Sequence, residues 1–141
     1  MNVILNGGQS NTRKGDINLP GSVDLTGKEN LLLKVVNNAG AANFALPTAV
    51  TDVSVYVCMS GDTAGNNTAA EAPSPNENCR ILLDGTCNPG DKLCLSSTNY
   101  GRLYAPGAGA GALTVWYIAE EAGVAGQAVL ARRVGPLAWT F

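Results

Sequence analysis

The sequence predicts an all-β protein, a small antiparallel β-sandwich or barrel with long loops and an extended N-terminal arm. Three observations predict this class. Apolar residues alternate with polar or mixed residues in several short runs, as in DVSVYVCMS over residues 52–60, which is typical of half-buried antiparallel strands. Combinations of Asp, Asn, Pro and Gly that favour turns separate these runs. No run keeps a helical spacing of apolar residues for three turns.

The first 22 residues are predicted to form the arm. They contain a short apolar VIL and then GGQSNT, which is too polar and too rich in glycine to pack as an element of its own. Plain terminal disorder fits the same residues, whereas an arm would become ordered against a neighbouring molecule. Residues 23–60 are predicted to be β throughout, with both faces of the LLLKVV strand largely apolar and a turn at residues 37–42.

Residues 61–78 are predicted to form a long inserted loop, because no periodicity survives there and two prolines bracket a serine. Such a loop would face solvent or pack on a neighbouring subunit. The turn signals DGTCNPG follow it and separate two further short strands. The strands predicted after the loop cover residues 80–83, 92–95, 113–120 and 127–134.

Two stretches about 60 residues apart resemble each other. GKENLLLKVVNNAGAANFALP (27–47) and DKLCLSSTNYGRLYAP (91–106) each run from a charged start through an apolar strand, an Asn-containing turn with Gly and a second strand to a proline. Two related β units and two ordinary hairpins both fit this pattern. The length of 141 residues predicts one domain, so the expected organisation is an arm (1–22), a β domain (23–136) and a C-terminal tail (137–141).

The composition limits the kinds of partner. Charged residues make up only 14% of the chain, below the average of about 25%, which suits a surface that is held against another protein. A net charge of −2 and a pI near 4.9 argue against a nucleic-acid partner. No apolar run approaches the roughly 18 residues of a membrane span, and the start MNVILNGGQ lacks the features of a signal peptide. We therefore expect no membrane partner, and a protein made and kept in a cytoplasm.

No catalytic set is expected. The chain contains no histidine, which excludes Ser-His-Asp and Cys-His arrangements. The adjacent carboxylates Glu120 and Glu121 would point to opposite sides of a strand rather than at one substrate. The sequence therefore predicts no enzymatic activity, no catalytic residue and no cofactor.

The four cysteines do not have the spacing of a metal site, because there is no C-x-x-C pair and no histidine to complete a mixed site. Cys58 and Cys94 lie in strand-like runs and are expected to be buried free thiols. Cys79 and Cys87 flank RILLDGT. They would form a disulfide if they lay on facing strands and the protein reached an oxidising exterior, and would otherwise stay reduced.

Two segments carry a family likeness. DLTGKENLLLKVVNNAG…FALPTAVTDV and NPGDKL…YGRLYAPGAGAGA…WYIAEEAGVAGQAVLARRVGP, in this order, resemble the capsid decoration (cement) proteins of tailed bacteriophages. The resemblance covers residues 23–57 and 88–136, and the chain departs from it in the insertion between Cys58 and Cys87 and in the tail after Pro136. The resemblance implies an all-β protein that binds the outside of the mature capsid, often as a trimer, and stabilises the shell. It implies neither catalysis nor a cofactor.

The predicted function is therefore that of a structural decoration protein on the exterior of a virion, assembled in the host cytoplasm. Its expected partners are the major capsid protein and further copies of itself, as a homotrimer. The alternative is a non-catalytic carbohydrate- or host-surface-binding β module. In that module Tyr56, Tyr104, Trp116 and Tyr117 would form an exposed stacking platform rather than fill the core or a subunit interface.

The end of the chain, ARRVGPLAWTF, is the predicted contact surface. On a strand, Arg132 and Arg133 point to opposite faces, so one of them is expected to reach an acidic or carbonyl-rich partner. After the Gly-Pro break, Leu137, Trp139 and Phe141 alternate with smaller residues, and Trp and Arg are enriched among interface hot spots. The tail either caps its own core or anchors to a neighbouring subunit or to the capsid.

Overall fold

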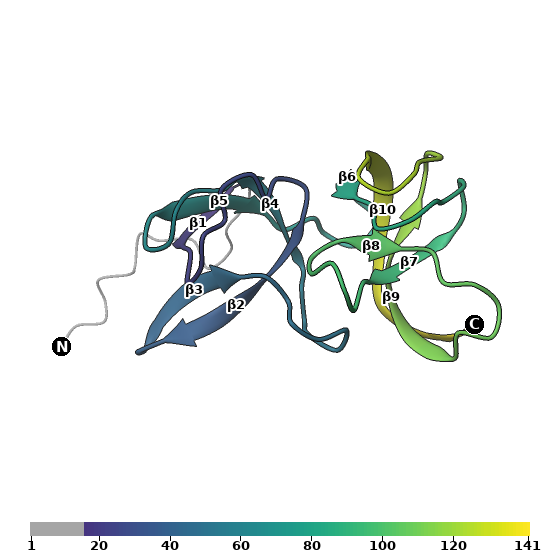
Figure 1. Ribbon diagram of the computed structural model, residues 1–141, viewed down its shortest axis with the longest axis horizontal. Helices are drawn as coiled ribbons and strands as arrows, with labels where there is room; N and C mark the ends of the chain where they lie inside the picture. Colours follow the sequence, from purple (N-terminus) through teal and green to yellow (C-terminus); the bar gives the residue numbers. More distant parts are fainter. Residues whose placement is uncertain (1–15) are drawn as a thin grey trace, which may run out of the picture.

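The computed structural model describes residues 16–141, which form two five-stranded antiparallel sheets and confirm the all-β class. None of the described residues belongs to a helix long and apolar enough to cross a membrane. Figure 1 shows the sheets as two units side by side along the chain's long axis. The first unit contains β1 (Ile17–Pro20), β2 (Leu32–Asn38), β3 (Ala41–Ala45), β4 (Tyr56–Ser60) and β5 (Asn67–Glu71). The second contains β6 (Asn78–Leu82), β7 (Lys92–Leu95), β8 (Leu103–Tyr104), β9 (Ala112–Ala119) and β10 (Ala128–Thr140).

The two units have the same topology. The strand order is β1-β5-β4-β2-β3 in the first sheet and β6-β10-β9-β7-β8 in the second, so each strand occupies the place of the strand five numbers earlier. The two similar sequence stretches fall on the hairpins β2–β3 and β7–β8, which are equivalent in this arrangement. The strand order therefore favours two related β units over two ordinary hairpins.

Each unit closes on itself in the same way. The residue after the first strand forms a parallel bridge to the third, Gly21 with Phe44 and Leu83 with Leu103. The next residue then donates to the same carbonyl oxygen: Ser22 to Phe44 at 2.9 Å, and Asp84 to Leu103 at 2.7 Å. Each sheet therefore curls so that its two edge strands meet at this bridge, and one of the two sheets is nearly barrel-shaped.

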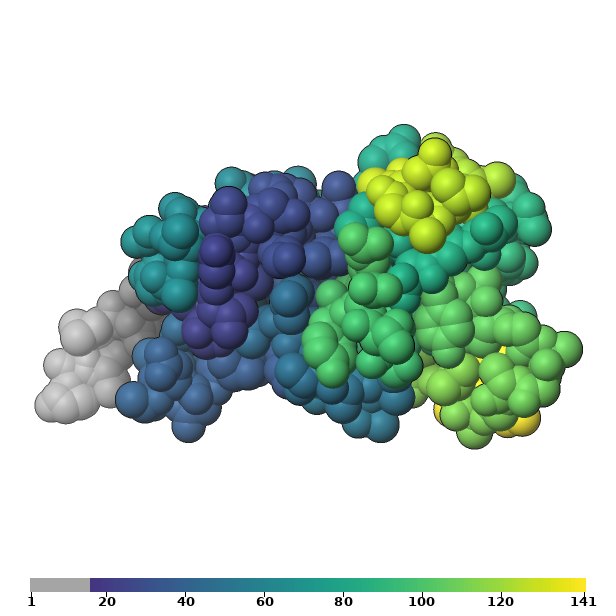
Figure 2. Space-filling model, viewed as in Figure 1, coloured from purple at the N-terminus to yellow at the C-terminus, as the bar shows by residue number. Residues whose placement is uncertain are grey.

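The cores explain why the units are joined. One buried cluster belongs to the first unit alone and contains Leu25, Leu33, Phe44, Cys58 and Ala70. The larger cluster is built from the second unit together with Leu32 and Val57 of the first. In the space-filling view the green surface around residue 100 lies directly against the blue first unit (Figure 2). The expected single β domain is thus two units that share one of their cores.

The predicted arm is partly wrong. Residues 1–15 lie outside the described residues, but Ile17–Pro20 form β1, which pairs with β5 in the register Ile17 opposite Ala70. Ile17 and Leu19 pack against the core of the first unit. The strand has only two inward apolar residues before Pro20, which is why the alternation did not stand out from its polar surroundings.

The predicted insertion and tail also contain strands. Residues 67–71 of the expected loop form β5, whose buried residues are Thr68 and Ala70. Small and polar inward residues give almost no hydrophobic alternation, so the sequence pattern missed this strand. Residues 137–140 of the expected tail continue β10 and pair with residues 112–115 of β9. Gly135-Pro136 shifts the register between the two strands but does not end β10.

Candidate interaction surface

The last residues of β10 and the first of β9 form a two-stranded ribbon, residues 112–115 and 137–140. Phe141 closes its end by donating from its amide to the carbonyl oxygen of Gly111 at 3.0 Å. Residues 137–140 are all exposed, although their backbone is paired. The tail therefore belongs to its own sheet by hydrogen bonding, while its side chains remain available for contact.

A bulge in β9 creates this ribbon. The register of β9 shifts against both neighbours at the same place, between Tyr117 and Val115. The neighbouring residues Trp116 and Tyr117 consequently both pack in the larger buried cluster, whereas successive side chains of a regular strand point to opposite faces. Gly135 lies against this bulge: a Cβ there would be 2.0 Å from the carbonyl oxygen of Val115. Only glycine therefore fits at position 135. Beyond this position β10 pairs with β9 in the shifted register of the ribbon.

One face of the ribbon is apolar. Leu113, Leu137 and Trp139 share it, because Trp139 lies opposite Leu113 and Leu137 opposite the buried Val115. Leu137 is 41% exposed and Trp139 44% exposed. The ammonium group of Lys92 lies 4.2 Å from the centre of the Trp139 ring, a cation–π contact that holds the indole in place.

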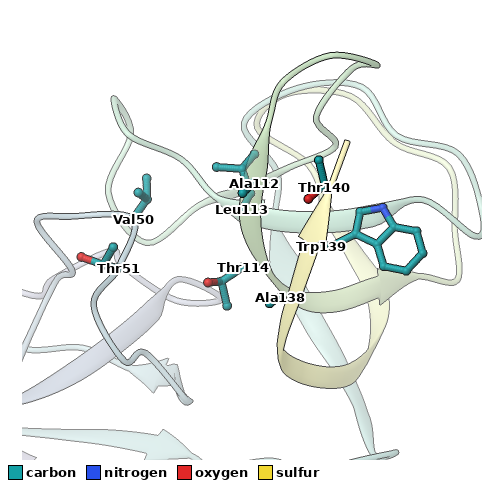
Figure 3. Close-up of a pocket in the computed structure, with 8 residues that line it drawn as sticks. All are labelled: Val50, Thr51, Ala112, Leu113, Thr114, Ala138, Trp139 and Thr140. Atoms are coloured by element: carbon teal, nitrogen blue, oxygen red, sulfur yellow. The ribbon is translucent and has the colours of Figure 1, made fainter.

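The other face of the ribbon carries small residues and borders a groove. The groove has a volume of about 480 Å³. It lies between the loop that carries Val50 and Thr51 in the first unit and the ribbon residues Ala112, Leu113, Thr114, Ala138, Trp139 and Thr140. Figure 3 shows Val50 and Thr51 across the groove from Thr114, with the Trp139 ring pointing away from them. No lining side chain of this groove is charged.

The loop on the far side of the groove is held by one carboxylate. Asp52 Oδ2 accepts hydrogen bonds from the amides of Thr48 at 2.7 Å and Ala49 at 3.1 Å, and pairs with Lys34 Nζ at 2.8 Å. The Lys34 hydrogen bond and the amide of Thr48 hold the pKa of the Asp52 carboxyl below its usual range. The groove wall is thereby fixed on β2 of the first unit.

The two predicted arginines are engaged within the chain. Arg132 pairs with Glu120 at 2.9 Å and donates to the carbonyl oxygen of Asn76. The guanidinium of Arg133 donates to the carbonyl oxygens of Pro73 and Gly135. Both side chains therefore fasten the segment that links the two units. The sequence placed them on opposite faces of a strand but could not show that this linker passes beside them.

The exposed aromatic platform that the alternative function requires does not form. Trp116 and Tyr117 are buried, and Tyr56 and Tyr104 are half-buried. The Tyr56 ring packs against Phe44 with centroids 5.3 Å apart. Trp116 and Tyr117 both enter the larger cluster because the bulge in β9 turns neighbouring residues to the same side, which alternation alone does not reveal.

All four cysteines are free thiols. Cys58 and Cys94 are buried, as predicted, and burial raises the pKa of each to about 11. Cys79 lies opposite Ala131 of β10, and Cys87 is bridged to Gly123, so these two residues do not face each other as the proposed disulfide requires. Within residues 16–141 no three Cys, Asp or Glu side chains gather into a group that could hold a metal ion.

Comparison with known proteins gives a match at the level of fold. No protein-family model matches the chain, and no curated protein matches it in sequence. Among solved structures, the chain is similar to the head fiber gp8.5 N base of bacteriophage phi29. The two share 15% sequence identity with a TM-score of 0.65, over 84% of this chain and 92% of that one. The chain therefore shares its fold with the base of a phage head fiber.

Proposed function

We propose that this protein is a structural component of a bacteriophage virion, a decoration protein that binds the outside of the head and stabilises it. The observation that carries the proposal is the fold shared with a phage head fiber base over 84% of this chain and 92% of the other. The sequence resemblance to capsid decoration proteins, over residues 23–57 and 88–136, supports it independently. A shared fold does not by itself assign a function, so the agreement of these two observations matters.

The proposed partner is the major capsid protein, bound through the ribbon. A two-stranded ribbon with an exposed leucine and tryptophan and no charged residue is suited to burial against another protein. Its backbone is preorganised by pairing with β9, so binding would order few additional residues. The protein would act on the capsid exterior as a homotrimer, after assembly in the host cytoplasm.

The test is attachment to heads that lack the protein. Heads of the phage that encodes it, assembled without this protein, are mixed with the purified wild-type chain and imaged by electron cryomicroscopy. We expect regular density on the outer surface and a higher temperature of head disruption. Heads that remain bare and equally labile at saturating protein would overturn the proposal.

A pair of matched variants tests the ribbon separately. Leu137→Asp places a charge on the apolar face of the ribbon, and Val124→Asp places one at a valine that is 51% exposed in the turn between β9 and β10. We expect Leu137→Asp to lower head occupancy at least tenfold and Val124→Asp to leave it unchanged. Equal occupancy for both variants would refute the ribbon as the attachment surface while leaving attachment itself established.

A further inference from the structure

The junction between the units is a contact between a hairpin loop and the start of a strand. The carbonyl oxygen of Gly101, in the loop between β7 and β8, accepts a hydrogen bond of 2.9 Å from the amide of Leu32 at the start of β2. A Cβ on Gly101 would lie 2.9 Å from the Leu32 carbonyl oxygen and 3.1 Å from Leu31 Cβ, so the loop backbone rests directly on the first unit. The first unit contributes the receiving surface, which is the start of β2 around Leu31 and Leu32, and the second unit contributes the loop between β7 and β8.

The receiving surface occurs a second time, on the second unit. Leu32 and Leu33 lie opposite Val57 and Tyr56, just as Lys92 and Leu93 lie opposite Ile118 and Tyr117. The Lys92 amide is therefore the counterpart of the Leu32 amide. No hydrogen bond within residues 16–141 joins it to a hairpin loop. A depression of about 320 Å³ lies there instead, and its lining includes Gly90, Lys92, Pro106, Trp139 and Phe141.

The hairpin that supplies this loop has a counterpart on the first unit, the β2–β3 hairpin. Its strands pair as far as Asn38 and Ala41 and leave only the short turn Ala39-Gly40, whereas residues 96–102 lie between β7 and β8. The short turn has its glycine in the left-handed region, with φ of 90° at Gly40. All of residues 37–42 are exposed and none is charged. A Cβ on Gly40 would meet nothing within 4 Å. Figure 1 shows this hairpin projecting from the end of the first unit that is remote from the second.

We propose that copies of this protein associate head to tail, with the β2–β3 hairpin of one copy docking in the depression beside Lys92 of the next. The contact between copies would use the counterparts of the two elements that meet within the chain, a hairpin end and the start of a strand. The hairpin brings no charge of its own into the depression, whose lining includes Asp91 and Lys92. Asp91 already accepts a hydrogen bond from the amide of Asn88 and Lys92 lies over the Trp139 ring, while Val35 and Ala41 of the hairpin supply apolar surface for that ring. This association is a property of the protein alone and does not depend on capsid binding.

The repeat of the junction is incomplete at one hydrogen bond. Within the chain the Leu82 amide also donates to the carbonyl oxygen of Asn30 at 3.0 Å. The counterpart of Leu82 in the first unit is Pro20, which has no amide hydrogen. The contact between copies is therefore weaker than the junction within the chain. Because its two surfaces differ, it is heterologous and builds a closed ring or an open chain of copies.

The test uses one variant for each surface. Ala41→Lys places a charge on the exposed hairpin, and Thr86→Arg fills the depression from an exposed position on its wall. Val124→Lys is the matched control at an exposed position on neither surface. Mass is measured by light scattering at about 100 µM without capsids, and circular dichroism and melting confirm the fold of each variant. If Ala41→Lys melts at a lower temperature than the wild type, Asn38→Lys replaces it as the hairpin variant. If Thr86→Arg does so, Pro106→Arg replaces it as the variant of the depression.

The two surfaces predict a distinctive result on mixing. We expect the wild type and Val124→Lys at a mass at least twofold the 14.5 kDa of the chain, and each surface variant at the mass of one chain. An equal mixture of the two surface variants should return to twice that mass, because one intact hairpin and one intact depression remain. A monomeric wild type, a surface variant that associates like the wild type, or a mixture that stays monomeric would each overturn the proposal.

Discussion

Replacing Gly135 with alanine tests how the ribbon is built. Gly135 lies on β10 where the register shifts, beside the bulge of β9. An added Cβ would be 2.0 Å from the Val115 carbonyl oxygen and 2.8 Å from Trp116 Cα, whereas real Cβ atoms essentially never approach another atom within 3.0 Å. The backbone of one strand must therefore move by about 1 Å.

The cost follows from what holds that backbone. Val115 is paired with Leu137 on one side and Cys94 on the other, so it cannot retreat alone. Overpacking usually costs about 1–3 kcal/mol, and each ladder hydrogen bond lost as the ribbon detaches costs about 1 kcal/mol more. We expect Gly135→Ala to lower the free energy of unfolding by about 3 kcal/mol. For a chain of this size that corresponds to a fall in Tm of about 10 °C.

The assay is urea and thermal unfolding followed by circular dichroism, with Gly107→Ala as the control. A Cβ at Gly107 meets nothing within 4 Å and its φ is not in the left-handed region, so this variant should unfold within about 0.5 kcal/mol of the wild type. A Gly135→Ala variant that unfolds within about 1 kcal/mol of the wild type would show that the strands accommodate the added Cβ. A Gly107→Ala variant that loses as much stability as Gly135→Ala would show that the loss does not come from the contact with Val115.

Three further predictions concern other parts of the chain. The pKa of Asp52 is lowered from 3.8, so its contribution to stability is present above about pH 3.8 and is lost as the pH falls through the folded pKa. The difference in the free energy of unfolding by urea between the wild type and Asp52→Asn should therefore shrink below pH 3.8. A difference that stays constant down to pH 2 would contradict the role of this carboxylate. Burial raises the pKa of Cys58, Cys79 and Cys94 to about 11. At pH 8 iodoacetamide should therefore modify these thiols at least tenfold more slowly in native than in urea-unfolded protein, which mass spectrometry measures. A disulfide between Cys79 and Cys87 in oxidised protein would show that these residues can approach each other. Gly101→Ala should lower the free energy of unfolding by about 2 kcal/mol in the same assay, because the new Cβ meets the Leu32 carbonyl oxygen and the φ of residue 101 is +85°. Stability equal to that of the wild type would mean that the junction tolerates a displaced loop.

The all-β class and the places of most strands follow from the sequence without knowledge of the tertiary structure. Alternation in DVSVYVCMS and turn chemistry in DGTCNPG are local properties, and local properties can be read without knowing the partner strand. The likeness between residues 27–47 and 91–106 fitted both two related units and two ordinary hairpins, and the strand order was needed to favour the former. The burial of Cys58 and Cys94 followed from the same alternation, because each lies in the middle of a strand.

The tertiary structure alone decided where the exposed surface lies. Arg132 and Arg133 are occupied because the linker between the units, more than 50 residues earlier in the chain, passes beside them. Trp116 and Tyr117 are both buried because a bulge against β7 and β10 shifts the register, while Trp139 stays exposed in a strand of similar pattern. Pairing register and chain crossing depend on contacts between distant residues, and a one-residue shift exchanges the buried and exposed faces of a strand. The local sequence does not indicate that shift. It therefore predicts where the strands of this protein lie but not which of their faces are exposed.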